Sequence, residues 1–395
     1  MTVAASKHAL SVPNPVRVWS ATSLRDSVLS WRDRLLADRR FQRWAASFPL
    51  TRKIAEKRAQ SLFDLCAGFV YSQVLLACVQ LRLFDILAER PQTIVELSPR
   101  LALAPASVAR LINAAAALRL VQCRGGGRFG LGVHGAALLA NPAIAAMIEH
   151  HALLYTDLSD PVSLLRGTGR ATALSRYWPY ARAQCPDTLT ADEVTPYSAL
   201  MSSSQALIAE DVLDAWPLSR HRCLIDVGGG EGAFLIAAAA KAPDLRLILY
   251  DLPAVAERAR ARLAASGLAH RATIACGDFL KSPLPPGADI VTLIRVLHDH
   301  DDDCAVTLLR NVRSALPKDG VLLIAEPICG TAATDIVGDA YFGFYLLAMG
   351  SGRPRHAAEL ASLLRVSGFD CCRILKTRRP LLTAVVIAHP GVRAH

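Results

Sequence analysis

The spacing of hydrophobic and polar residues changes midway along the chain. From about residue 60 to 145, apolar side chains recur at helical spacing, and a short hairpin turns at Gly125-Gly126-Gly127. From residue 221 onward, short apolar runs alternate with helical segments, which is typical of a parallel sheet. The pattern predicts a mostly α winged-helix domain followed by an α/β domain of the doubly wound, Rossmann type.

Five apolar runs are predicted to form the parallel strands: Cys223–Val227, Leu245–Tyr250, Ala272–Cys276, Ile290–Ile294 and Val321–Ala325. A final antiparallel pair is expected near Cys372–Leu375 and Leu382–Ala388. We divide the chain into a basic, aromatic-rich extension at residues 1–59, a winged-helix dimerisation domain with linker helices at 60–200, and a catalytic domain at 201–395.

In the winged-helix region, Leu81–Leu87 is expected to close one helix, and Ile94–Leu97 and Ala106–Ile112 are expected to begin two more. Winged helices often bind DNA. The Ala-rich middle helices lack a cluster of Arg, Asn or Gln that could contact base edges. Dimerisation is therefore favoured over nucleic-acid binding for this domain.

The stretch Leu65–Leu81 carries no charge. Its length is below the roughly 20 residues that a membrane span needs, and Asp64 and Arg82 bracket it. A helix that is apolar on nearly all sides is more simply a core or dimer-interface helix. We therefore expect no membrane span here.

Most of the net charge of +10 lies at the N-terminus, where residues 1–60 hold twelve Lys or Arg and four Asp or Glu. Residues 16–60 interleave that charge with Trp and Phe, which suits contact with an anionic membrane surface. The alternative is an extension that packs its aromatic face on the body. The rest of the chain offers no basic face, so no nucleic-acid partner is expected.

The ten cysteines are scattered, with no CxxC pair or Cys/His spacing that would build a zinc site, and no other metal is expected. They indicate reduced thiols of a cytoplasmic protein. The N-terminus shows no basic segment followed by an apolar stretch and a cleavage site, so no secretory signal is expected. The expected location is the cytoplasm, with possible peripheral contact at the cytoplasmic membrane.

A glycine-rich loop follows the first predicted strand in the sequence Asp226-Val227-Gly228-Gly229-Gly230-Glu231-Gly232. Gly228 and Gly230 allow a sharp turn and close approach of a ligand. The loop also passes as a GxGxxA dinucleotide fingerprint, so an NAD(P)-dependent oxidoreductase is a competing hypothesis.

Carboxylates at the ends of three strands favour a different cofactor. Asp226 lies just before the glycines, where it can face a cationic ligand, and Asp251 follows the second strand, where it can accept ribose hydroxyls. Asp278 and Phe279 follow the third strand, suited to an adenine amine and to stacking on a purine. Each Asp could instead cap a helix or a turn.

A histidine follows the fourth strand in Arg295-Val296-Leu297-His298-Asp299-His300. At the ligand-binding edge of the sheet, His298 is well placed as a general base. The alternative is a helix cap. Glu326 ends the fifth strand, and neighbouring strand ends can place it against the imidazole. No serine elbow, Walker loop or HExxH sequence competes for this role.

The order DVGGGEG, DLP, GDF, RVLHDH and AEP behind a winged helix resembles the plant-type O-methyltransferase family, which includes caffeate and acetylserotonin O-methyltransferases, over roughly residues 60–390. The resemblance implies a homodimer that uses S-adenosyl-L-methionine as methyl donor. It implies that Gly228 and Gly230 line the donor site, that Asp251 holds the ribose and that Asp278-Phe279 hold the adenine. Arg295 would lie beside the donor, and Tyr197–Met201 would contribute to the pocket. His298 would be the base, and Glu326 would be the carboxylate that orients it.

Two positions depart from the pattern of that family. His300 stands where many plant members have Trp, and Pro354 stands where many have Glu. A second carboxylate beside the base is therefore expected to be missing, which leaves Glu326 as the support of His298.

The expected acceptor is a large apolar molecule with a hydroxyl group. Tyr341–Met349 offers aromatic and aliphatic walls with little charge, although ordinary core packing explains it equally well. Leu62–Gln73 and Leu154–Pro161 resemble the carotenoid branch of the family, the demethylspheroidene (hydroxyneurosporene) O-methyltransferases of purple phototrophic bacteria. That resemblance implies methylation of the tertiary 1-hydroxyl of an acyclic carotenoid. A phenolic or polyketide acceptor is the alternative.

Overall fold

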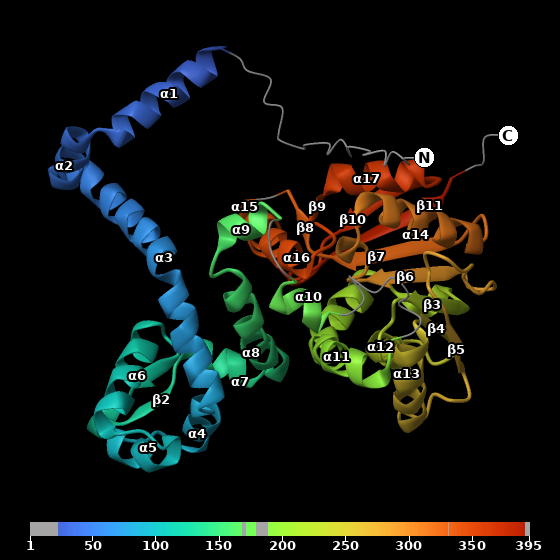
Figure 1. Cartoon of the computed structure of the whole chain (residues 1–395), viewed down its shortest axis with the longest axis horizontal. Helices are drawn as coiled ribbons and strands as arrows, with labels where there is room; N and C mark the ends of the chain where they lie inside the picture. Colours follow the sequence, from blue (N-terminus) through green and yellow to red (C-terminus); the bar gives the residue numbers. More distant parts are fainter. Residues whose placement is uncertain (1–22, 168–170, 179–188, 331, 392–395) are drawn as a thin grey trace, which may run out of the picture. The chain divides into compact units, whose positions relative to one another are not determined.

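The computed structural model describes residues 23–167, 171–178, 189–330 and 332–391. By contacts between Cα atoms, the chain separates into two compact units, Met1–Val74 and Leu75–His395. Helices α1 (Ser23–Ala37), α2 (Arg39–Ser47) and most of α3 (Pro49–Gln80) belong to the first unit, and the predicted winged-helix and catalytic regions belong to the second (Figure 1).

The predicted winged helix is present. Its elements are α4 (Leu83–Glu89), α5 (Ile94–Leu101), α6 (Pro105–Ala117), β1 (Val121–Cys123) and β2 (Phe129–Leu131). The glycine turn joins the two strands of the hairpin, which pair antiparallel.

The prediction that Leu81–Leu87 closes a helix is wrong. Helix α3 ends at Gln80, and Arg82 takes a left-handed conformation with φ of +54°. Helix α4 then begins at Leu83, and both Leu83 and Leu87 are buried. The chain therefore turns at Arg82, because a new direction lets the apolar residues after it reach the core of the winged helix.

Helix α3 contains the apolar stretch and is 32 residues long. It is long and apolar enough to cross a membrane, with a mean hydropathy of 1.8 over an 18-residue window of which 17% is buried. Helices α7 (Val133–Leu139) and α8 (Pro142–Asp157) pass the same test only if taken together, and they are bent by 98°. The prediction that this stretch is too short to cross a membrane was therefore wrong. Helices at dimer interfaces can have the same length and composition.

The predicted doubly wound domain has a seven-stranded sheet in the order β10-β11-β7-β6-β3-β4-β5. Its strands are β3 (Cys223–Val227), β4 (Arg246–Asp251), β5 (Ala272–Cys276), β6 (Ile290–Ile294), β7 (Val321–Glu326), β10 (Phe369–Leu375) and β11 (Ala384–Pro390). The five central strands run parallel, and β10 and β11 add the expected antiparallel edge. Strand β4 begins one residue later than predicted, and β10 begins three residues earlier.

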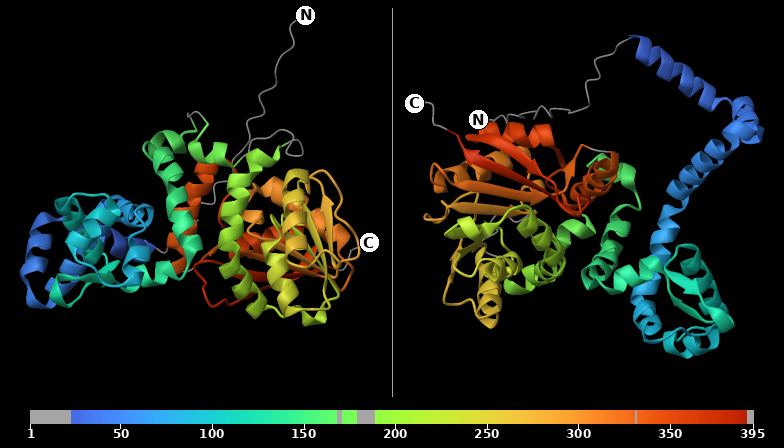
Figure 2. Two further views of the ribbon diagram at one scale, coloured as in Figure 1. Left: turned by 90° about the horizontal axis from the view of Figure 1, so that it is seen from below. Right: turned by 180° about the vertical axis from the view of Figure 1, so that it is seen from behind.

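Helices cover both faces of this sheet (Figure 2). One face packs against α11 (Ala191–Ala215), α12 (Ala233–Lys241) and α13 (Pro253–Ala265). The opposite face packs against α14 (Asp302–Ala315) and α17 (Ala357–Val366). Strands β3 and β6 are buried at every residue, as expected for central parallel strands.

The remaining elements are α9 (Pro161–Leu165), α10 (Ala173–Tyr177), the strands β8 (Ile328–Cys329) and β9 (Arg355–His356), α15 (Ala332–Asp335), a π-helix (Ile336–Phe342) and α16 (Gly343–Met349). Helix α11 runs without a break across the domain boundary predicted at residue 200. Its first half therefore reaches the ligand-binding edge of the sheet while its second half packs in the core of the catalytic domain.

Candidate active site

The glycine loop after β3 has the geometry that close approach of a ligand requires. Gly228 and Gly230 have φ of +69° and +57°, in the left-handed region that favours glycine. A Cβ at Gly228 would lie 2.8 Å from Cγ2 of Val296, whereas one at Gly230 would meet no heavy atom within 4 Å. Gly228 is therefore a packing requirement, and Gly230 faces open space in a pocket that it helps to line.

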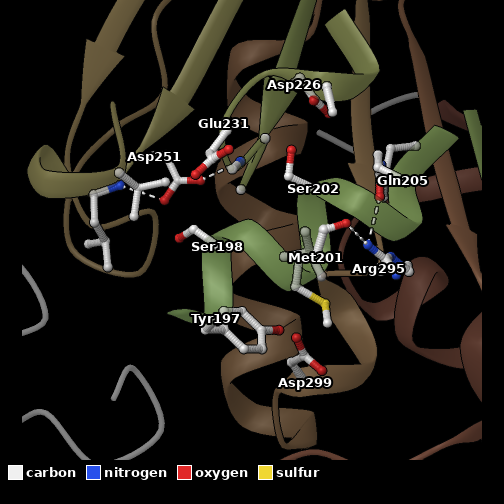
Figure 3. A pocket seen from close by; sticks show the side chains of 18 of the residues that line it. Tyr197, Ser198, Met201, Ser202, Gln205, Asp226, Glu231, Asp251, Arg295 and Asp299 are labelled. Carbon is white, nitrogen blue, oxygen red and sulfur yellow. Dashed lines mark hydrogen bonds between the residues drawn. The ribbon is translucent and has the colours of Figure 1, made fainter. Parts of the chain in front are cut away.

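That pocket lies at the carboxyl ends of β3, β4 and β6, as predicted. Figure 3 shows the helix α11 contributing Tyr197, Ser198, Met201, Ser202 and Gln205, and the strand ends contributing Asp226, Glu231, Asp251, Arg295 and Asp299. The predicted contribution of the segment Tyr197–Met201 to the pocket is thus confirmed in its placement.

Two carboxylates, the buried Asp226 and the partly buried Asp251, form one wall of the pocket. Asp226 accepts a hydrogen bond of 2.6 Å from the Thr292 hydroxyl, and Asp251 accepts the backbone N–H of Gly230 at 2.8 Å. Burial raises the pKa of Asp226 to about 7 and the pKa of Asp251 to about 6, against the effect of these hydrogen bonds. Both groups would gain from a ligand that brings positive charge or hydroxyl donors.

Asp278 and Phe279 are placed differently. Phe279 lines the pocket and meets the ring of His300 edge-on at 5.4 Å. Asp278 is not among the lining residues, because its carboxylate accepts the N–H of Leu280 at 2.9 Å and lies 3.2 Å from the Lys281 ammonium. The carboxylate of Asp278 is therefore explained by its role in a turn, which was the alternative to ligand binding. Phe279 lies at the pocket, as predicted.

Arg295 lines the pocket and is hydrogen-bonded to helix α11. Its guanidinium donates to the Ser204 hydroxyl at 2.8 Å, to the Met201 carbonyl at 3.0 Å and to the Gln205 side chain at 2.8 Å. Its backbone has φ of +56°, which is uncommon for a residue with a Cβ. Burial lowers its pKa, opposed by nearby Tyr197 and Asp299.

A second set of contacts to α11 is centred on Glu231 of the glycine loop. Its carboxylate pairs with Arg258 and lies 3.0 Å from Arg262, both on α13. The same two arginines donate to Thr195 and Ser202 of α11. The glycine loop, α13 and the pocket half of α11 are thus linked by one charged network.

His298 is buried in a short 3-10 turn directly after β6. Its Nδ1 lies 3.0 Å from Oε2 of Glu326, and the same oxygen accepts the backbone N–H of His298 at 2.7 Å. The predicted placement of Glu326 against the imidazole is confirmed. The carboxylate therefore holds the backbone of the histidine by a hydrogen bond and lies within ion-pair distance of its ring.

The expectation that His298 lacks a second carboxylate is wrong. Asp299 places Oδ1 3.1 Å from Nε2 of His298, on the opposite side of the ring from Glu326. Pro354 does occupy the predicted position, but the 3-10 turn brings the acid next in sequence onto the ring instead. Burial opposes the imidazolium, yet the charges of Asp299 and Glu326 outweigh it and raise the pKa of His298 to about 9.

An aromatic cluster extends away from the base. Phe342 lies 5.8 Å from His298 between ring centroids, and Tyr341 and Tyr345 stack at 5.8 Å. The hydroxyls of these tyrosines lie 2.7 Å and 2.9 Å from Nε2 of His151 and His150, respectively. The aromatic residues were predicted as walls, whereas the two histidines of α8 were missed because nothing in their local sequence indicates what they contact.

A separate group of possible metal ligands lies at Cys329, Asp339 and His356, whose ligand atoms are within 4.8 Å of one another. Burial and the neighbouring Asp339 raise the pKa of the Cys329 thiol to about 12. Metal binding needs the thiolate. We assign no role to this group.

Comparisons with known proteins agree with this site. An O-methyltransferase domain family matches residues 155–370, and an O-methyltransferase dimerisation domain matches residues 63–141. The chain is 46% identical to demethylspheroidene O-methyltransferase of Cereibacter sphaeroides, covering 90% of this chain and 93% of that protein. It is 40% identical to the protein of the same name from Rhodobacter capsulatus, covering 87% and 85%.

Among solved structures, the SAH-bound methyltransferase of calicheamicin biosynthesis is similar, with 26% identity, a TM-score of 0.71 and coverage of 85% of this chain and 98% of that one. The dehydrogenase hypothesis that the glycine loop left open is therefore wrong, and the winged helix is a dimerisation domain, as favoured over DNA binding. The chain belongs to the S-adenosylmethionine-dependent O-methyltransferase family.

Proposed function

We propose that this enzyme transfers a methyl group to the tertiary 1-hydroxyl of an acyclic hydroxylated carotenoid, with His298 as general base. The observation that carries the assignment of the base is the buried imidazole held between Glu326 and Asp299 beside the pocket. The acceptor class is supported by the 46% identical relative, whose name specifies demethylspheroidene.

The pocket suits S-adenosylmethionine, which supplies an electrophilic methyl group on a sulfonium. The open space at Gly230 leaves room for a ligand against the backbone of the loop. The carboxylates of Asp226, which is buried, and Asp251, which is partly buried, suit a cationic ligand with hydroxyl groups, and Phe279 offers a ring for stacking. We assign Asp226, Gly228, Gly230, Asp251, Phe279 and Arg295 to this site, and Asp278 as a residue that positions Phe279.

His298 takes the proton of the acceptor hydroxyl through Nε2. Glu326 holds the ring from the Nδ1 side and stabilises the imidazolium that forms. A tertiary alcohol is far less acidic than an imidazolium, so proton removal must accompany methyl transfer. Because Asp299 lies 3.1 Å from Nε2, an acceptor hydroxyl has to displace or share that contact.

The acceptor lies along the aromatic cluster of Phe342, Tyr341 and Tyr345. Tyr345 is buried and Tyr341 and Phe342 are partly buried, and the hydroxyls of Tyr341 and Tyr345 are already paired with His151 and His150. Because these hydroxyls already have hydrogen-bond partners within the protein, the wall favours an acceptor that carries no polar groups where it contacts the aromatic cluster. A phenolic or polyketide acceptor is the alternative within the family.

The enzyme acts as a homodimer. The matched dimerisation domain begins at residue 63, and Phe63, Leu65 and Phe69 of α3 are each at least 60% exposed in the single chain. Such a large exposed apolar face needs a partner, and a second copy of the chain supplies one. The expected molecular mass in sedimentation is twice the 42.4 kDa of the chain.

Methyl transfer needs no metal, because the donor methyl is already electrophilic and the protein has mainly to align the reacting groups. We expect prolonged treatment with EDTA to leave the rate unchanged. A loss of activity that added divalent cations restore would contradict this expectation.

The experiment that tests the proposal measures transfer from labelled S-adenosylmethionine to hydroxylated carotenoids and to a panel of phenols. Wild type should methylate the carotenoid, and His298→Ala should lose about 10²–10⁴-fold in rate. His270→Ala, at an exposed histidine, is the matched control. Wild-type rates in His298→Ala would remove it as the base, and preference for a phenol would replace the carotenoid as acceptor.

A further inference from the structure

The N-terminal arm, which we define as residues 25–58, lies before the matched dimerisation domain and within the first compact unit. Its centre is helix α2, which begins after Asp38. The Asp38 carboxylate accepts the backbone N–H groups of Arg40 and Phe41 at 2.6 Å and 2.9 Å. Asp38 is thus the N-cap of the helix and fixes where it begins. The side of the helix on which each later residue lies then follows from its position in the sequence.

Aromatic rings form a ladder along one face of α2. Phe41 and Trp44 have ring centroids 5.6 Å apart, and Trp44 stacks on Phe48 at 5.0 Å. Trp44 is 51% exposed, and Leu50, which follows in the sequence, is 80% exposed. A continuous apolar surface therefore faces solvent in the single chain.

The other side of α2 is basic. At 100° per residue, Arg39 and Arg43 project away from the ladder, and Arg40 lies at its edge, about 40° from Trp44. All three are exposed, and in the described part of the chain no carboxylate pairs with their side chains. The whole arm holds ten Lys or Arg against four Asp or Glu, a net charge of +6.

This combination distinguishes among the possible occupants of the surface. A second copy of the chain is accounted for by α3 from residue 63 onward, which the dimerisation match includes. A nucleic acid would engage the arginines but would leave most of the stacked ladder in water. A bilayer with anionic lipids engages both faces, since rings enter the acyl boundary while arginines remain at the phosphates.

We propose that the N-terminal arm docks this enzyme on the surface of an anionic lipid bilayer, with Phe41, Trp44 and Phe48 inserted at the interface and Arg39, Arg40 and Arg43 at the headgroups. This contact is peripheral and reversible, because α2 spans nine residues and no covalent anchor is invoked. It does not rest on the identity of the methyl acceptor.

The test uses the full chain with vesicles of phosphatidylcholine alone or with 30% phosphatidylglycerol, separated by flotation. Wild type should float with the anionic vesicles and lose binding in high salt. The triple change Arg39→Gln, Arg40→Gln and Arg43→Gln should weaken binding about a hundredfold. A control removes the same charge from exposed arginines of the catalytic region, Arg220, Arg310 and Arg365, and should bind as wild type does.

Insertion of the ladder is tested separately with Phe41→Ser and Phe48→Ser, which keep Trp44 as the fluorophore and should weaken the quenching of tryptophan emission by brominated lipids while circular dichroism stays unchanged. Equal binding to neutral and anionic vesicles would overturn the proposal. An equal loss of vesicle binding in the control triple variant would also overturn the proposal. Salt-sensitive binding that is tighter to duplex DNA than to anionic vesicles would overturn it as well.

Discussion

The pocket and the N-terminal arm use charge and aromatic rings in opposite ways. At the active site, His298 and Asp226 are buried and Arg295 is partly buried, and each has partners from another part of the chain. In the arm, Arg43 and Trp44 are exposed to solvent, and Trp44 packs against the rings of Phe41 and Phe48. Buried charges have shifted pKa values and strict geometry, whereas the exposed ones are free to meet a surface.

The comparison predicts that single changes in the pocket alter chemistry and stability, while several changes in the arm alter only where the enzyme binds. Three single substitutions and one triple variant test this difference, beginning with the one for which we expect the largest effect.

Glu326→Gln should lower the single-turnover rate of methyl transfer about a hundredfold, because the neutral amide no longer stabilises the imidazolium of His298. Glu210→Gln makes the same chemical change at an exposed carboxylate that pairs with Arg379, and its rate should match wild type. A Glu326→Gln rate within twofold of wild type would remove the carboxylate from the mechanism.

Arg295→Met should lower the free energy of unfolding by about 1–2 kcal/mol, because it removes three hydrogen bonds to part-buried partners on α11. It should also weaken S-adenosylhomocysteine binding about tenfold in calorimetry, since it loosens the pocket half of α11. Arg379→Met is the control, because Arg379 fastens the other half of the same helix through Asp211 and the Leu207 carbonyl.

The control should lose stability but retain affinity for S-adenosylhomocysteine. If both variants weaken that affinity equally, α11 responds as a whole and Arg295 has no local role in the pocket.

Asp299→Asn should move the acidic limb of the pH profile of kcat/KM to lower pH. The base works only when neutral, so activity rises with pH through the pKa of His298, which nearby Asp299 raises toward 9. Removing that charge lowers the pKa and makes the neutral form available at lower pH. Asp303→Asn, at an exposed acid on α14, should leave the limb in place, and an unmoved limb in Asp299→Asn would contradict the assignment.

The smallest effect is expected for the arm. Replacing Arg39, Arg40 and Arg43 by Gln together should change the free energy of unfolding by less than about 0.5 kcal/mol for each position, because the side chains are exposed. Thermal unfolding in buffer without lipid measures this. A large loss of stability would show that the arm packs on the body, as the alternative in the sequence analysis holds.

Much of the catalytic domain could be predicted from the sequence, because periodicity and strand-end chemistry are local signals. Strands β3, β5 and β6 match their predicted bounds, and Glu326 reaches His298 because neighbouring parallel strands end at one edge. The family resemblance also predicts Arg295 and Tyr197 at the pocket, and both residues line it.

What could not be predicted depends on backbone conformation. The left-handed Arg82 splits one expected helix into two, and the 3-10 turn after β6 places the Asp299 carboxylate on Nε2. The contacts of His150 and His151 join residues about 190 positions apart, and no periodicity reports such pairs. Asp278 was a plausible ligand by position, yet its own turn accounts for its carboxylate.

The π-helix Ile336–Phe342 bears on how such an enzyme could change its acceptor during evolution. A π-helix closes its hydrogen bonds over five residues, so each turn holds more residues than an α-helical turn, and such segments recur at functional sites. Deleting one residue there would let the segment return to α-helical geometry while α16 kept its orientation, because six α-helical residues at about 100° each turn about as far as the seven residues of the π-helix. A single mutational event would then change which residues of this segment face the acceptor, while α16 and the donor pocket, made from strand ends and α11, kept their places.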